Sequence, residues 1–258
     1  MHDVVGLIGR RTDEIVTALR AVPDDELHAP SLLPGWSRLT IACHLRYGAR
    51  ALTWMTDAAL AGEPASYYPE GRATERPGTL LPEPGESPGE VVAGLAEAAD
   101  RLQRRWEART AEQWHLDVDE PPDNPDLGTL SLGTFAALRL TEVEVHGTDL
   151  GLGLADWDPW FVQHGLTFRM ARLGRLRILD APRQAWLLRA EHPMFGLRIV
   201  AEAGTVHAEV DTEARQGDQV IRLASDRDRL ALLLGRPLLE PSPDAEAVEE
   251  FRSAVPGP

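Results

Sequence analysis

Lysine is absent from the 258-residue sequence, so all 26 basic residues are arginine. This absence excludes Schiff-base chemistry and P-loop phosphate binding, both of which use a lysine amine. Asp and Glu together number 41, which gives a formal net charge of −15. We expect no nucleic-acid partner, because binding a phosphate backbone requires clustered cations.

Cysteine is nearly absent as well, since Cys43 is the single one in the sequence. One cysteine excludes an intramolecular disulfide and any cysteine-based zinc knuckle, so a metal would need histidine and carboxylate ligands. No run of eighteen apolar residues occurs, and the first apolar stretch precedes Arg10 and Arg11, the reverse of a signal peptide. The sequence therefore predicts a soluble cytoplasmic protein without a membrane partner.

Apolar residues make up 43% of the chain, which at this length suffices for a sizeable core in one or two domains. Their spacing predicts four long helices. The first covers residues 3–20, the second runs from a Ser37 cap to Gly62, the third follows a Ser87-Pro88-Gly89-Glu90 capping box, and the fourth covers residues 131–150. Four long helices joined by loops indicate a bundle.

The pattern changes after residue 155. Asp158 and Pro159 predict the start of a fifth helix that ends near Gly174. Short segments at 185–190, 197–202, 206–210 and 219–223 then alternate apolar and polar residues, as half-buried strands do, and a short helix over 230–234 follows. We predict an α+β protein with a helical bundle over 1–155 and a linking helix with a small α/β domain over 156–258.

Two stretches between the predicted helices are rich in proline and polar residues. Glu63–Gly89 is read as a long loop, and loops of this length are usually functional or disordered. Asp117–Gly128 is read as a second loop before the fourth helix.

The strongest candidate for chemistry is the segment around Glu142 and His146. Residues four apart on a helix lie on the same face, so this carboxylate and this imidazole can reach one point. Helical bundles use this arrangement to bind metals. His44 is the natural third ligand, because it lies among apolar residues of the second helix, where an unpaired imidazole would be costly.

Simpler interpretations remain open at this point. Glu142 and His146 could form an ordinary ion pair, and His44 could be a core histidine that bonds to a backbone carbonyl. Glu144 and Asp149 suit a solvated helix face, although Asp149, three residues after His146, could instead orient its ring. Cys43 suits a small buried side chain better than a nucleophile.

Two groups of residues resemble a known family. They are Pro34-Gly35-Trp36-Ser37 with His44, and Glu142-Val143-Glu144-Val145-His146 with Asp149-Leu150. Together they resemble the mycothiol-dependent maleylpyruvate isomerase family, a branch of the DinB-like metal-binding helical bundles. The C-terminal third matches more loosely, through Leu232-Leu233-Leu234-Gly235-Arg236.

The resemblance implies a DinB-like four-helix bundle that holds one divalent metal, typically zinc, on His44, Glu142 and His146. It implies a smaller sterol-carrier-like α/β domain after the bundle, and mycothiol, a thiol of actinobacteria, as cosubstrate. Two imidazoles and one carboxylate leave zinc an open fourth position, which a thiol can take and where it loses its proton. The chain would then be a monomer or weak homo-oligomer that acts on an electrophilic small molecule.

One loop departs from the family pattern. The isomerases carry a Tyr-Pro-Gly-Gly stretch followed by an arginine, whereas this chain has Tyr68-Pro69-Glu70-Gly71, with Arg76 further on. Glu70 adds negative charge where a dianionic keto acid is expected, which favours another electrophile.

The residues expected to bind anions are arginines. Arg236 is the candidate catalytic residue, since it follows the helix-ending Gly235 and matches a Gly-Arg pair of the family. Arg72, Arg76 and Arg139 are candidates for substrate binding, although in a chain with 26 arginines most guanidinium groups are solvated or ion-paired.

We predict a metal-dependent enzyme that activates mycothiol as a thiolate and transfers it to an electrophile, an S-transferase. The first alternative is a thiol-dependent cis-trans isomerase of a maleylpyruvate-type keto acid, which needs the same thiolate. The second alternative is a protein that binds a metal or ligand without turnover.

Overall fold

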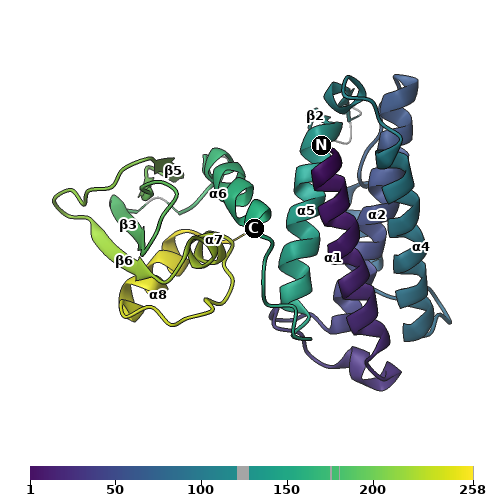
Figure 1. The fold of residues 1–258 in the computed structure, drawn as a ribbon, viewed down its shortest axis with the longest axis horizontal. Helices are drawn as coiled ribbons and strands as arrows, with labels where there is room; N and C mark the ends of the chain where they lie inside the picture. The colour runs from purple at the N-terminus through teal and green to yellow at the C-terminus, as the bar shows by residue number, and fades with distance from the viewer. Residues whose placement is uncertain (121–127, 175, 180, 258) are drawn as a thin grey trace. The chain divides into compact units, whose positions relative to one another are not determined.

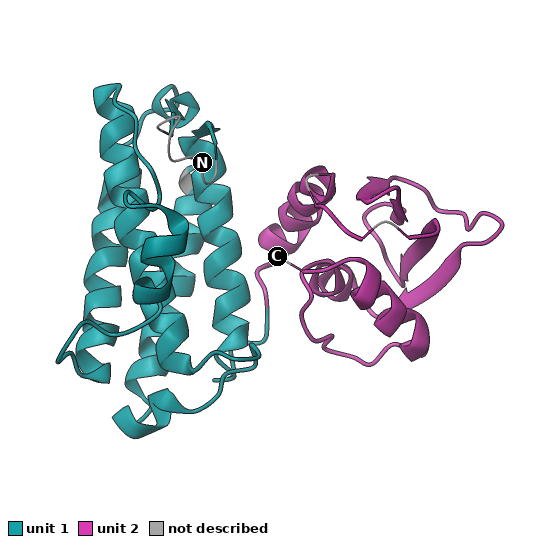
Figure 2. Ribbon diagram, turned by 180° about the vertical axis from the view of Figure 1, so that it is seen from behind, with its two compact units in different colours: residues 1–156 teal, residues 157–258 magenta. Residues whose placement is uncertain are grey.

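The computed structural model describes residues 1–120, 128–174, 176–179 and 181–257. These residues form two compact units, Met1–Asp156 and Trp157–Pro258, which are described separately below (Figure 2). Residues 121–127 of the predicted loop Asp117–Gly128 lie outside the described part of the chain. No described helix is long and apolar enough to cross a membrane.

Four long helices build the first unit, and their bounds confirm the predicted four-helix bundle (Figure 1). They are α1 (His2–Arg20), α2 (Arg38–Ala61), α4 (Pro88–Glu107) and α5 (Leu132–Asp149). Helices α1 and α2 each pack against both α4 and α5, which buries the apolar stripes of all four in one core.

The predicted caps explain where these helices begin. The Ser37 side chain accepts a hydrogen bond from the Thr40 amide at the start of α2. Ser87 and Glu90 form both bonds of a capping box at the start of α4. Ser131, which was not predicted as a cap, accepts a hydrogen bond from the Thr134 amide at the start of α5. Each cap satisfies a backbone N–H that the first helical turn leaves without a partner.

The stretch Glu63–Gly89 is not the structureless loop that its composition suggests. It contains α3 (Arg72–Thr79), a helix of 8 residues that follows Gly71 at a φ of 89° and carries Pro77 inside it. The sequence does not predict this helix, because it contains Pro77 and Gly78 and both residue types usually end helices. Short elements complete the unit: the 3₁₀ turns Asp24–His28 and Gln113–His115 and the strand pair β1 (Asp117–Val118) and β2 (Leu130–Ser131).

The second unit is a four-stranded mixed sheet with helices. Its elements are α6 (Pro159–Leu173), β3 (Gln184–Ala190), β4 (Arg198–Glu202), β5 (Thr205–Glu209), β6 (Gln219–Leu223), α7 (Asp226–Leu233) and α8 (Ala245–Ala254). The strand order is β5-β4-β3-β6, in which β3 pairs antiparallel with β4 and parallel with β6. The α+β class is therefore confirmed.

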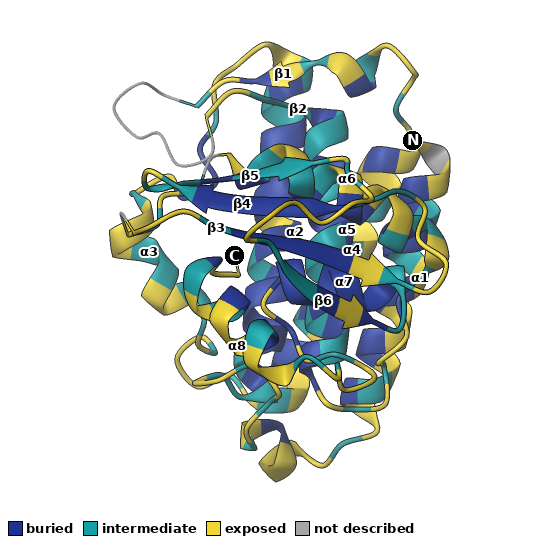
Figure 3. Ribbon diagram, turned by 90° about the vertical axis from the view of Figure 1, so that its left-hand side faces the viewer, coloured by how far each residue is buried: buried dark blue, intermediate teal, exposed yellow. Residues whose placement is uncertain are grey.

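The central strands differ from the predicted half-buried pattern. Four successive residues of β3 and four of β4 are buried (Figure 3). Successive residues point to opposite faces of a sheet, so both faces of these strands are covered. Arg198 of β4 lies inside this packing and donates two hydrogen bonds to the carboxylate of Asp218, at 2.7 and 2.8 Å.

Candidate functional site

The three predicted metal ligands lie together where α2 packs against α5, with His44 buried and with Glu142 and His146 partly exposed. His44 projects from α2, and its Nε2 is 3.5 Å from Oε1 of Glu142 on α5. The rings of His44 and His146 have their centroids 5.0 Å apart and stand at 89° to each other. The structure thus brings together residues that are about one hundred positions apart in the sequence.

Asp149 orients the His146 ring. Its Oδ2 is 2.9 Å from His146 Nδ1, which leaves Nε2 as the other nitrogen of the ring. Asp149 is 1% exposed, and of the two interpretations left open for it, this contact agrees with the one in which it orients the His146 ring. Glu144 is 2% exposed, so the expectation that it faces solvent is wrong. Glu144 Oε2 lies 3.3 Å from Nε of Arg11, which comes from α1 and was not predicted as its partner.

Trp36 covers both histidines from the turn that precedes α2. Its ring meets the His44 ring edge-on at 5.4 Å and stacks on the His146 ring at 5.9 Å. The Arg76 guanidinium lies over the Trp36 ring at 5.9 Å from its centroid. An aromatic wall beside the imidazoles lowers the access of water and strengthens nearby charge interactions.

His44 is held in its neutral form. Burial is the main cause that lowers its pKa well below 6.5, and the positive charges of His146, Arg76, Arg139 and Arg72 lower it further. A neutral imidazole is the form that binds a metal. Within the described residues, the buried Nδ1 of His44 has no hydrogen-bond partner.

This donor set fits a divalent metal by its chemistry. It supplies a buried neutral imidazole, a second imidazole oriented by a carboxylate, and a carboxylate next to the first imidazole, and two histidines with one carboxylate are a ligand set of catalytic zinc sites. In the part of the chain that the structure describes, no three His, Cys, Asp or Glu side chains are close enough to surround an ion. His44, Glu142 and His146 lie close to one another without surrounding a common point, and the assignment of a metal to them is a proposal.

Two of the predicted arginines lie on α3. The Arg72 guanidinium is 5.5 Å from the centroid of the Tyr68 ring, and Arg76 Nη1 donates to the Tyr68 hydroxyl at 3.2 Å. Both contribute positive charge at His44. The unpredicted helix α3 thus carries two cations to the candidate site.

Tyr47 connects α3 to α2. Its hydroxyl oxygen lies 2.8 Å from the carbonyl oxygen of Tyr67 and 2.8 Å from Oε2 of Glu75. The rings of Tyr47 and Tyr68 stack at 5.3 Å. Sequence reasoning missed Tyr47, although its position three residues after His44 places it on the same face of the helix.

Glu70, which was expected to add negative charge near the substrate, has its side chain exposed to solvent. Glu70 is exposed, and its backbone N–H donates to Oε1 of Glu75. The acidic residue in contact with the aromatic cluster is Glu75, which bonds to Tyr47. The argument from Glu70 against an anionic substrate is therefore weak.

The remaining two arginines lie in different units. Arg139 is 1% exposed, and its Nη1 donates to Oε2 of Glu142 at 3.1 Å. Arg236 belongs to the second unit, where its Nη1 donates to the carbonyl oxygen of Leu234 at 3.1 Å. The structure brings Arg72, Arg76 and Arg139 to the site in the first unit, and it describes Arg236 only within the second.

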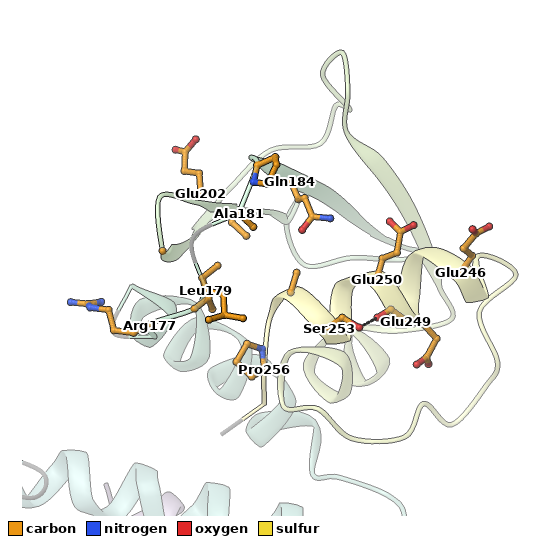
Figure 4. Close-up of a pocket in the computed structure, with 15 residues that line it drawn as sticks. Arg177, Leu179, Ala181, Gln184, Glu202, Glu246, Glu249, Glu250, Ser253 and Pro256 are labelled. Carbon is orange, nitrogen blue, oxygen red and sulfur yellow. Dashed lines mark hydrogen bonds between the residues drawn. The ribbon is translucent and has the colours of Figure 1, made fainter.

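Two cavities among the described residues are lined by none of the three predicted metal ligands. The larger, of about 750 Å³, belongs to the second unit and is bordered by Leu179, Gln184, Glu250 and Pro256 among others (Figure 4). None of the predicted site residues lines it. The smaller, of about 420 Å³, lies between α1 and α4 and reaches Arg139.

A helical bundle that places two imidazoles and a carboxylate among arginine and aromatic side chains defines a candidate metal-binding domain for anionic ligands. The sequence matches the family model described as the mycothiol maleylpyruvate isomerase N-terminal domain over residues 8–151. The match covers more than half of the chain, so the chain belongs to this family. The resemblance noted in the sequence is thereby confirmed.

Solved structures show the same fold over nearly the whole chain. The crystal structure of the mycothiol-dependent maleylpyruvate isomerase has a TM-score of 0.69 and 19% identity, and the match covers 94% of this chain and 92% of that chain. A histidine-to-alanine mutant of that enzyme gives a TM-score of 0.68 at 19% identity, covering 91% and 89%. No curated protein matches the sequence.

These comparisons bear on the predicted activity. Membership of a family named for an isomerase supports an enzyme. It also favours the isomerase alternative over the S-transferase that was the main prediction, because the family is named for an isomerase.

Proposed function

We propose that the chain is a mycothiol-dependent cis-trans isomerase of a small unsaturated keto acid that carries carboxylate groups. Its family and the chemistry of the site both support this function. The proposal reverses the preference for thiol transfer, which depended on the charge of Glu70.

The observation that carries the proposal is the positive charge around His44. Arg72, Arg76 and Arg139 all lie near enough to lower the pKa of this imidazole. In a chain with a net charge of −15, three guanidinium groups at one buried histidine form a local attraction for an anion. Arginine binds carboxylates through two parallel N–H donors, so Arg72 and Arg76 are suited to hold the substrate.

His44, Glu142 and His146 would hold the divalent metal, for which we propose zinc. When bound, such a metal lowers the pKa of a coordinated thiol so that the thiolate is present at neutral pH. Asp149 keeps the His146 ring in the orientation that this role needs.

The chain's residues then control what the thiolate does. The sulfur adds to one carbon of the cis double bond, and the electron pair of that bond moves onto the neighbouring carbonyl oxygen. Arg72 and Arg76 hold the carboxylates while the resulting single bond rotates. The electron pair returns, the carbon–sulfur bond breaks, and the thiolate leaves with the trans product, so no proton or electron is consumed.

The test is an ultraviolet assay of maleylpyruvate isomerisation with zinc-loaded protein and mycothiol. We expect turnover that needs both the metal and the thiol. Arg76→Ala should raise KM by about 10- to 100-fold, since a hydrogen bond to a charged group contributes about 1.5–3 kcal/mol. Arg101→Ala, which removes an exposed arginine of α4, is the matched control and should leave KM unchanged.

Two results would contradict the proposal. A wild-type protein that binds zinc and mycothiol but isomerises nothing points to the non-catalytic alternative. A stable thioether product, detected by mass spectrometry, points instead to S-transfer.

Further parts of the expected function remain proposals. We place the reaction in the cytoplasm, where a low-molecular-weight thiol is kept reduced and where a free cysteine persists. The sterol-carrier-like character of the second unit, the role of Arg236 as an anion clamp and the monomeric or weakly oligomeric state are proposals of the same kind.

A further inference from the structure

Gly48 lies in the middle of α2, one helical turn after His44 and on the same face. Its backbone is helical, and its φ is not among the positive values that favour glycine. Glycine inside a helix costs about 0.5–1 kcal/mol relative to alanine. A need for conformational freedom therefore does not explain why residue 48 is a glycine. The explanation is the lack of room for a side chain at this position.

Three polar atoms occupy the place that a side chain at this position would take. A Cβ added to Gly48 would lie 2.9 Å from the Tyr67 hydroxyl, 3.0 Å from Arg139 Nη1 and 3.1 Å from Glu142 Oε2. A real Cβ essentially never lies closer than 3.0 Å to such an atom, so a larger residue at position 48 would displace the Tyr67 hydroxyl. The contacts with Arg139 and Glu142 are tighter than most real ones, so these two groups would also have to give way.

Arg139 and Glu142 have opposite charges, and Tyr67 contributes a neutral hydroxyl. Arg139 Nη1 donates to Glu142 Oε2, whereas the contact with His44 Nε2, at 3.5 Å, is made by the other oxygen, Oε1. Tyr67 is buried, and its hydroxyl also lies next to Gly48 of α2. Arg139 is too deeply buried to be an ordinary surface partner.

We propose that Gly48, Tyr67 and Arg139 form a brace that fixes the Glu142 carboxylate as a metal ligand, with Oε2 held by the brace and Oε1 directed to His44. Gly48 leaves room for the carboxylate, and Arg139 donates a charged hydrogen bond to it. The Tyr67 hydroxyl packs beside them at the same position of α2. All three are positioning residues, and Arg139 then acts through Glu142 rather than on the substrate.

This inference rests on the proposed metal site but not on the proposed reaction. Partners that orient a metal ligand typically change metal affinity by about 10- to 100-fold when they are replaced. A brace therefore predicts lost metal affinity, whereas an Arg139 that binds substrate predicts a raised KM with metal affinity unchanged.

The experiment is a competition titration of zinc against a chelator, with the visible spectrum of the cobalt-loaded protein as a second readout. The variants are Gly48→Ala, Tyr67→Phe and Arg139→Gln in the full chain. Gly6→Ala is the matched control, because a Cβ there would meet its nearest atom, Arg10 Nη1, at an ordinary 3.7 Å. Circular dichroism checks that each variant keeps its helices.

We expect Gly48→Ala and Arg139→Gln to weaken zinc binding by about 10-fold or more and to change the cobalt spectrum, as braced ligands do. Tyr67→Phe should give a smaller loss, and Gly6→Ala none. Wild-type zinc affinity and an unaltered spectrum in Gly48→Ala would overturn the brace while leaving the proposed function intact. A wild-type protein that binds no zinc would overturn the metal site of the proposed function, and the brace with it.

Discussion

Cys43 shows how burial decides the chemistry of a side chain. The thiol is 1% exposed, and burial raises its pKa to about 11, against a smaller lowering by Arg46. The thiolate is the reactive form, so a thiol with this pKa reacts slowly at neutral pH.

We predict that Cys43 resists alkylation by iodoacetamide at pH 7.5 in the folded protein and reacts readily in urea. Because its pKa lies above that of a free thiol, the native rate should keep rising with pH to about pH 11, whereas the rate of a free thiol levels off near pH 9. Mass spectrometry of the labelled protein measures both rates. Rapid labelling of the native protein at pH 7.5 would contradict the buried assignment.

Two acidic residues, Glu70 before α3 and Glu75 within it, also differ in their surroundings. Glu70 is exposed, whereas Glu75 bonds to the Tyr47 hydroxyl and accepts from the Glu70 amide. We predict that Glu70→Gln changes KM for the keto acid by less than about twofold, since exposed charges interact weakly. Glu75→Gln should raise KM more, because α3 then loses part of its attachment and Arg72 and Arg76 move. Steady-state kinetics of the two variants test this, and a larger effect at Glu70 would show that its charge faces the substrate.

The sequence predicts these side chains unevenly. His44, Glu142 and His146 stand out because helix spacing and the family motifs both point to them. The sequence does not indicate the roles of Tyr47 and Gly48, because their partners Tyr67 and Arg139 come from other segments of the chain. The burial of Glu144 is not indicated either, because its partner Arg11 lies on α1. A contact of that kind is visible only once the helices are packed.

Helix starts were the most predictable part of the fold. Ser37, Ser87 and Asp158 cap helices as expected, because a cap depends on residues that are neighbours in sequence. Helices α3 and α8 were missed. Neither has a side-chain cap bond, and proline or glycine lies in or just before both, so local signals are absent.

The sheet of the second unit depends on one buried ion pair. Arg198 of β4 bonds to Asp218, just before β6, and to Glu209 of β5, and its own side chain is fully buried. The hydrogen bonds from Arg198 lower the pKa of Asp218 from 3.8 to about 2. A carboxylate with a lowered pKa stabilises the fold above its unfolded pKa, and that stability is lost as the pH falls toward the folded value.

We predict that Asp218→Asn lowers the free energy of unfolding by at least about 2 kcal/mol at pH 6, from the size of this shift. The difference from wild type should shrink as the pH drops from 4 toward 2, because the Asp218 carboxyl becomes protonated in the unfolded chain first and then, around pH 2, in the folded protein. Urea denaturation at several pH values measures it. A difference that stays constant over this range would mean that the pair contributes little.

The two compact units divide the proposed functions between them. All proposed metal ligands and the brace belong to Met1–Asp156, and Arg236 belongs to Trp157–Pro258. The matched family model, residues 8–151, lies wholly within the first unit.

We predict that a fragment of residues 1–156 folds as a helical bundle and binds zinc within about threefold of the full chain, since its core is its own. If Arg236 clamps an anion, the fragment should lose turnover while it keeps its metal. Circular dichroism, zinc titration and the isomerase assay on the fragment measure these properties. A folded fragment with strongly weakened zinc binding would assign part of the metal site to the second unit.

The stacking of Trp36 has an optical consequence. Its indole ring lies against both imidazoles and beneath the Arg76 guanidinium, at centroid distances between 5.4 and 5.9 Å. Indole emission responds to charges and to quenching groups at this range. The protein therefore carries its own fluorophore at the candidate site, and a variant in which the six other tryptophans are replaced by phenylalanine would report each binding event as a change in emission intensity or colour.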